Sequence, residues 1–134
     1  MIEFFFAREP RVLMARISGI YDIDDMTRFD TFVTQFVARN GEVRALYDFT
    51  GVESVAVPMR RLEERARQPS LVGGLRVIVA PPVIGVGMTR TFTERQSEAG
   101  HAAPIVVGKL EEAYALLGLH YKAAFLLVED TELR

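Results

Sequence analysis

The sequence has 134 residues, of which 49% are hydrophobic and 25% charged, and its formal net charge at pH 7 is -2. This length and composition indicate one globular domain and exclude a disordered chain. The small net charge disfavours binding of nucleic acid, or of an anionic membrane surface, through bulk charge. The absence of cysteine excludes disulfides, thiolate zinc sites and a cysteine nucleophile. With two histidines, a metal site would have to be rich in carboxylates, and we expect none.

No targeting segment or membrane span is expected. The apolar start of the chain is interrupted by Glu3, Arg8 and Glu9, before the core of a signal peptide could form. The longest apolar run, residues 77–86, is much shorter than the ~20 residues that cross a bilayer. We therefore expect a cytoplasmic protein.

Two strands are predicted at the start of the chain, over residues 4–6 and 12–17, with Pro10 in the turn between them. A helix then begins after Asp22, a good N-cap residue, and ends at Gly41. Its apolar stripe has helical spacing and consists of Met26, Phe29, Val33, Phe36 and Val37.

Strands and helices alternate through the rest of the chain. Strands are predicted over residues 43–47, 75–80 and 104–107, and helices over residues 58–68, 87–99 and 109–117. The face of the second helix is assigned to Met59, Leu62 and Ala66. That of the third is assigned to Met88, Phe92, Arg95 and Ala99.

This alternation predicts an α/β domain with a single mixed, mostly parallel sheet of about five strands and four main helices. The first strand is expected to lie antiparallel at an edge. The domain is assigned to residues 1–119. Residues 120–134 form a C-terminal extension that could be helical, add an edge strand or pack on a second subunit. The residues expected to be buried are Phe29, Val33, Phe36, Leu46, Val77, Val79, Phe92 and Leu117.

Five segments, taken in order, carry a resemblance to a known family: residues 17–19, 46–52, 76–81, 87–92 and 112–117. Together they resemble the SpoIIAA-like (STAS-like) family of anti-sigma-factor antagonists, in its uncharacterised bacterial branch, and more distantly the lipid-carrying Sec14-type domains. The resemblance implies a regulatory binding module. One departure concerns the aspartate-serine pair that carries the phosphorylation site in the antagonists. Ala56 and Val57 stand at that position here, so we expect no phosphorylation site.

Asp48 and Thr50 follow the strand predicted over residues 43–47. Ligands of open α/β sheets bind at the carboxyl ends of the strands, so both are candidate ligand-binding residues. The structural alternative is a turn in which Asp48 accepts hydrogen bonds from neighbouring backbone N–H groups.

Gly87 and Arg90 lie where the chain enters the helix predicted over residues 87–99. Backbone N–H groups at a helix start, with an arginine beside them, can hold an anion. The segment lacks the third glycine of a dinucleotide fingerprint and the Gly-Lys-Ser/Thr of a P-loop, so no cofactor is expected. The structural alternative is a tight helix entry in which Arg90 pairs with a carboxylate. If the strands are neighbours, both candidate pairs are expected at one edge of the sheet.

No residue is predicted to be catalytic, because the serines lack a nucleophile-elbow context and the two histidines are far apart in the sequence. The favoured hypothesis is a non-enzymatic binding or regulatory module that docks a protein partner or a small anionic or lipid-like ligand. The alternatives are a small-molecule enzyme that uses Asp48 and Arg90, and a structural homo-oligomer such as a homodimer. An enzyme should show a deep pocket with a perturbed titratable group, and a docking module a shallow apolar patch.

Overall fold

The computed structural model describes residues 1–120 and 125–129. Six strands form one sheet in the order β5-β4-β3-β2-β1-β6. The elements, in chain order, are β1 (Ile2–Ala7), β2 (Val12–Tyr21), α1 (Ile23–Asn40), β3 (Arg44–Val55), α2 (Met59–Ala66), β4 (Arg76–Val79), α3 (Gly85–Glu98), β5 (Ile105–Val107), α4 (Leu110–Leu117) and β6 (Leu126–Leu127). The strands β2, β3, β4 and β5 run parallel to one another, whereas β1 is antiparallel to both β2 and β6. The predicted mixed α/β architecture is thus confirmed, with one strand more than expected.

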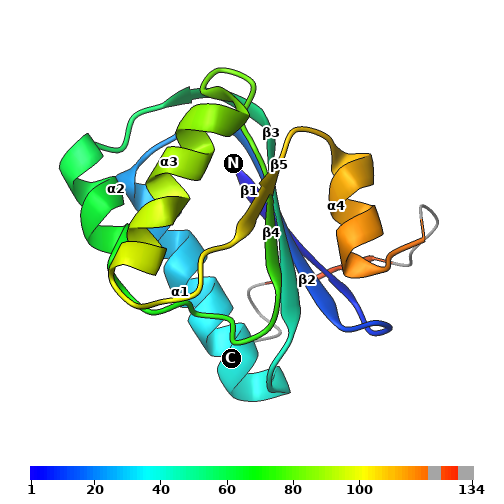
Figure 1. Cartoon of the computed structure of the whole chain (residues 1–134). Coiled ribbons are helices and arrows are strands. Elements are labelled where there is room, and N and C mark those ends of the chain that lie inside the picture. Colours follow the sequence, from blue (N-terminus) through cyan, green and yellow to red (C-terminus); the bar gives the residue numbers. More distant parts are fainter. Residues whose placement is uncertain (121–124, 130–134) are drawn as a thin grey trace.

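The helices divide between the two faces of the sheet. Figure 1 shows α1, α2 and α3 on one face and α4 on the other. Each face has its own core: Phe29, Val33 and Phe36 of α1 pack on the first, and Leu117 of α4 packs on Leu46 and Val77 on the second. None of the helices in the described part of the chain is both long and apolar enough to cross a membrane.

Helix α1 begins where its sequence predicts, because its N-terminus is doubly capped. The Asp22 carboxylate accepts a hydrogen bond from the Asp25 N–H at 2.9 Å, and the Asp25 carboxylate accepts one from the Asp22 N–H at 3.2 Å. This capping box satisfies two backbone donors that the helix itself cannot pair.

The predicted position of the first strand is wrong, because β1 is not at an edge. The short strand β6 pairs with Phe5 and Phe6 of β1 on the side away from β2. Residues 125–129 of the expected C-terminal extension therefore include an added edge strand. Residues 121–124 and 130–134 lie outside the described residues, and the division of the chain at residue 119 stays a prediction.

The predicted end of the third strand is also wrong, because β3 continues to Val55. Residues 51–55 pair with the second half of β2, which itself runs on to Tyr21. Gly51 permits this pairing at an irregularity in the ladder, since a Cβ there would lie 3.0 Å from the Ser18 Cβ. The pairing with β2 overrides the turn preference of Asp48, Thr50 and Gly51.

Seven of the eight residues expected in the core are buried, and Phe92 is the exception. Helix α3 turns a different face to the sheet from the one expected: Met88 is 57% exposed, whereas Thr89 and Gln96 are buried. Phe92 is half-buried because it faces a cavity rather than the core. In α2, Met59 is exposed, while Leu62 and Ala66 face the same cavity.

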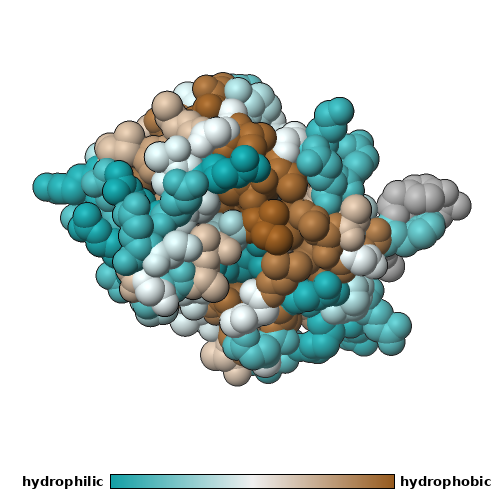
Figure 2. Space-filling view, in the orientation of Figure 1, coloured by the Kyte–Doolittle hydropathy of each residue, from teal (hydrophilic) through white to brown (hydrophobic). Residues whose placement is uncertain are grey.

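The surface carries an apolar stretch along one edge of the sheet. Figure 2 shows apolar residues gathered over the β5 edge, between α3 and α4, and Ile105 of β5 is 41% exposed. At the opposite edge, Leu126 and Leu127 of β6 are exposed as well. Exposed strand edges can pair with another chain. Homodimer formation stays a prediction.

Candidate functional site

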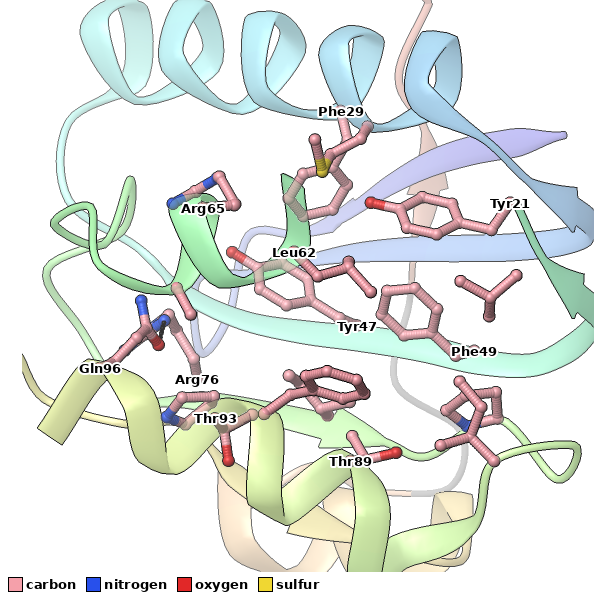
Figure 3. A pocket seen from close by; sticks show the side chains of 18 of the residues that line it. Tyr21, Phe29, Tyr47, Phe49, Leu62, Arg65, Arg76, Thr89, Thr93 and Gln96 are labelled. Carbon is pink, nitrogen blue, oxygen red and sulfur yellow. Dashed lines mark hydrogen bonds between the residues drawn. The ribbon is translucent and has the colours of Figure 1, made fainter. Parts of the chain in front are cut away.

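A cavity of about 210 Å³ lies on the face of the sheet that carries α1, α2 and α3. It opens to solvent, and every element that surrounds it contributes side chains. Strands β3 and β4 form the floor, α1 and α3 form two walls, and α2 lies between these two helices (Figure 3). Helix α2 has no buried residue, and Ala66, Thr89 and Thr93 are too small to fill the space between the helices.

Aromatic and aliphatic side chains line most of the cavity. The Tyr47 ring meets Phe29 of α1 edge-on, with 4.9 Å between the ring centroids. Tyr21 and Phe49 meet in the same way at 5.5 Å. Ile78 from the floor and Phe92 from α3 complete the apolar lining. Such a surface binds an apolar body without directional contacts.

Polar side chains gather at one end of the cavity, around Arg76 of β4 (Figure 3). The Arg76 side chain donates one hydrogen bond to the Gln96 side-chain oxygen at 3.2 Å and another to the backbone carbonyl of Ala102. Gln96 in turn donates to the Gln68 carbonyl at 3.5 Å. Arg76 is only 9% exposed, and its burial lowers the pKa of the guanidinium, because desolvation disfavours the charged form.

An ion pair joins α1 to α2 beside this polar end. The Arg65 Nε lies 3.0 and 3.2 Å from the two carboxylate oxygens of Asp30. Burial raises the pKa of Asp30, and the Arg65 charge opposes that rise. The pair ties α2, which has no buried residue, to α1 in the cavity wall.

Two tyrosine hydroxyls face the cavity, those of Tyr21 and Tyr47 (Figure 3). Burial raises the pKa of both phenols, so they stay protonated at neutral pH and can donate a hydrogen bond. The described residues provide no hydrogen-bond partner for either hydroxyl, and neither oxygen is sealed from solvent. Both are therefore available to a ligand.

The sequence-predicted residues Asp48 and Thr50 lie close together, but away from this cavity. Asp48 is in β3, two residues after Leu46, so its side chain points to the α4 face. Its carboxylate accepts hydrogen bonds from the Thr50 backbone N–H at 2.9 Å and the Thr50 hydroxyl at 2.7 Å. The Arg16 Nε lies 3.6 Å from the same carboxylate. These local contacts satisfy Asp48. The hydrogen bond from the Thr50 N–H is of the kind that the structural alternative expected, but it lies within β3 and not in a turn.

Gly87 and Arg90 share α3 and lie on the opposite face of the sheet from Asp48. Arg90 donates a hydrogen bond to the Val106 carbonyl at 3.2 Å and is otherwise exposed. Neither residue lines the cavity. The structure therefore does not bring the two predicted pairs together, and ligand binding at any of the four residues stays a prediction.

Sequence reasoning missed the side chains that give the cavity its polar end, above all Arg76 and Gln96. A signal for Arg76 is present, because it is the one charged residue in the otherwise apolar run of residues 75–80. A charge inside a buried strand needs a partner, which makes its surroundings a candidate site. For Tyr47 and Arg65 no such signal exists, because they line the same cavity only through the way in which α2 packs on the sheet.

In residues 1–120 and 125–129, no group of three or more histidine, aspartate or glutamate side chains is arranged to hold a metal ion. No family model matches the sequence. No curated protein matches it either. Among solved structures, the chain is similar to "Structure of the Anti-Sigma Factor Antagonist SpoIIAA in its Unphosphorylated Form". The identity is 14% and the TM-score 0.49, over 80% of this chain and 88% of that one.

Proposed function

We propose that the chain is a non-enzymatic binding module that holds a small, largely apolar molecule in the cavity beneath α2. The observation that supports this most is the cavity itself, with aromatic walls and a cluster of polar groups at one end. Most of the same sheet face is filled by side chains of α1. Ligand sites are typically concave and mostly apolar, with a few polar groups that orient the ligand.

The chemistry of the cavity lining favours binding over catalysis. The Asp30 carboxylate is engaged by Arg65, and both tyrosines hold their protons at neutral pH. The hydroxyls of Thr89 and Thr93 donate to backbone carbonyls of their own helix. The described lining therefore offers hydrogen-bond donors and a positive charge, but no activated nucleophile or unpaired base.

The enzyme hypothesis built on Asp48 and Arg90 gains no support, because the sheet separates the two residues. Docking of a protein partner, the other mode of binding expected from the sequence, stays a prediction.

A larger side chain placed in the cavity tests whether the cavity is the ligand site. Thr93 lines the cavity and the neighbouring Thr91 is exposed, yet each hydroxyl donates only to a backbone carbonyl within α3. Thr93→Phe should occupy the cavity, and Thr91→Phe provides a matched control on the same helix.

Octan-1-ol serves as a neutral apolar probe, titrated against labelled protein and followed by amide chemical shifts. We expect saturable shifts at cavity residues such as Leu62 and Ile78, but not in α4. The shifts should persist in Thr91→Phe and disappear in Thr93→Phe. Shifts that survive in Thr93→Phe, or no saturable binding to the parent protein, would contradict the proposal.

A further inference from the structure

The polar end of the cavity carries an unbalanced positive charge. The charged residues in the described lining are Asp30, Arg65 and Arg76. Asp30 and Arg65 neutralise each other as an ion pair. Arg76 has no carboxylate partner among the described residues, and its hydrogen bonds to Gln96 and Ala102 go to a neutral amide and a backbone carbonyl. One elementary positive charge therefore remains at this end.

The Arg76 guanidinium also keeps unused donors. A guanidinium has five N–H donors in a planar fork, and the contacts to Gln96 and Ala102 use two of them. Figure 3 shows Arg76 beside Gln96 at one end of the cavity, with the Tyr47 hydroxyl between this end and the aromatic walls. The planar fork and a phenol donor together match the two oxygens of a carboxylate.

From this arrangement we infer that the ligand is a small monocarboxylic acid with an apolar body, its carboxylate held by Arg76 and the Tyr47 hydroxyl. The inference rests on the proposed function and adds the chemical class and the orientation of the ligand. The apolar body extends from there toward the Tyr21–Phe49 end of the cavity (Figure 3), within an apolar lining to which Phe92 and Ile78 contribute. A volume of about 210 Å³ is below the ~300–1,000 Å³ of pockets for drug-sized ligands, so the acid is small.

A carboxylate fits better than a phosphate group. A carboxylate carries one negative charge, equal to the single positive charge that the lining leaves unbalanced. A phosphate monoester carries nearly two at neutral pH and would bring an unpaired negative charge into a mostly apolar space. The aromatic walls suit the apolar body of such an acid and offer nothing to a second charged group.

A purely structural role for Arg76 makes a different prediction. Its hydrogen bonds tie β4 to the end of α3 and to the segment before β5. If this were its whole role, the charge of a ligand's head group would not affect binding. A series of ligands with one apolar body and different head groups therefore separates the two roles without any substitution.

The test titrates the intact chain at neutral pH with octanoate, octan-1-ol, octylammonium and octyl phosphate, by isothermal titration calorimetry. Octanoate should bind about tenfold or more tightly than the alcohol, as expected for a charge-assisted hydrogen bond in a desolvated site. Octylammonium should bind more weakly than the alcohol. Octyl phosphate should bind more weakly than octanoate.

Arg76→Gln removes the charge and keeps a hydrogen-bonding side chain. Arg44→Gln is its control, because Arg44 lies on the neighbouring strand and also bonds a backbone carbonyl, that of Leu117, outside the cavity. Arg76→Gln should bind octanoate and octan-1-ol with similar affinity. Arg44→Gln should keep the preference for the acid. If Arg76→Gln does not fold, the comparison of head groups on the parent protein still distinguishes a ligand-binding role of Arg76 from a purely structural one.

The outcomes distinguish a failure of the proposed function from a failure of the inference that the ligand is a carboxylic acid. If none of the four compounds binds, the proposed function fails. If octan-1-ol binds as tightly as octanoate, the cavity is a ligand site but the inference is overturned. A preference for the acid that persists in Arg76→Gln overturns it as well, because the carboxylate would then lie elsewhere. Tighter binding of octyl phosphate than of octanoate would overturn the assignment to carboxylic acids.

Discussion

The hydroxyl of Tyr47 gives a sharp prediction, because its role in the unliganded protein differs from its role in ligand binding. Tyr47 is 7% exposed, and its ring is fixed by the edge-on contact with Phe29. Within the described part of the chain its hydroxyl has no hydrogen-bond partner. Tyr47→Phe keeps the ring and removes only this group.

Without ligand, Tyr47→Phe should leave the free energy of unfolding unchanged or raise it by up to ~1 kcal/mol. Burying a hydroxyl without a partner costs about 1–3 kcal/mol, and part of that cost is offset here because the oxygen faces an open cavity. The usual loss of a buried tyrosine hydrogen bond has the opposite sign, about 0.5–1.5 kcal/mol of destabilisation. The sign of the change therefore reports whether the hydroxyl is paired.

Urea denaturation measures the stability, and calorimetric titration with octanoate measures the affinity. Tyr47→Phe should weaken octanoate binding by several-fold, since a hydrogen bond worth about 1 kcal/mol is lost. Tyr114→Phe, on the α4 face, is the control and should leave the affinity unchanged. A Tyr47→Phe variant that is destabilised by 1 kcal/mol or more and binds octanoate normally would refute the reasoning.

Three further predictions concern stability, pH and modification. Leu117→Ala should destabilise the protein by ~2–5 kcal/mol in urea denaturation, because Leu117 is fully buried beneath the sheet, and a change below ~1 kcal/mol would contradict the assigned α4 packing. Burial raises the pKa of Asp30, so the folded state binds this proton more tightly than the unfolded state. The stability of the parent protein relative to Asp30→Asn should therefore fall as the pH rises from below the usual aspartate pKa through the raised one. A rise of this relative stability over the same pH range would contradict the assignment. After incubation with a kinase of the class that phosphorylates anti-sigma-factor antagonists, mass spectrometry should find no phosphate on residues 54–60. Stoichiometric phosphate on Ser54 would support a phosphorylation switch and contradict this prediction.

The order of elements could be predicted from the sequence because local signals mark most of their ends. Asp22 caps α1, and Gly118, which ends α4, adopts the left-handed conformation that glycine favours. The extension of β3 to Val55 could not be predicted in this way, since it depends on pairing with the far half of β2. The covering of β1 by β6 depends likewise on a contact between the two ends of the chain.

The candidate site was harder to predict than the fold, because the cavity is a space that the side chains of α1, α2 and α3 leave unfilled. An apolar residue such as Phe92 has the same periodicity whether it faces a core or a cavity. The buried face of α3 carries Thr89 and Gln96, which a search for an apolar stripe passes over. The separation of Asp48 from Arg90 follows from the alternation of side chains along β3, which could be applied only once the length of that strand was known.

The position of a bound acid tests the central claim most directly. In isotope-filtered NMR spectra of the octanoate complex, the methylene group next to the carboxylate should show contacts to Tyr47 and Gln96. The terminal methyl group should show contacts to Tyr21 and Phe49, at the other end of the cavity (Figure 3). Contacts confined to α4 or to the exposed β5 edge, or the terminal methyl group lying beside Gln96, would contradict the account.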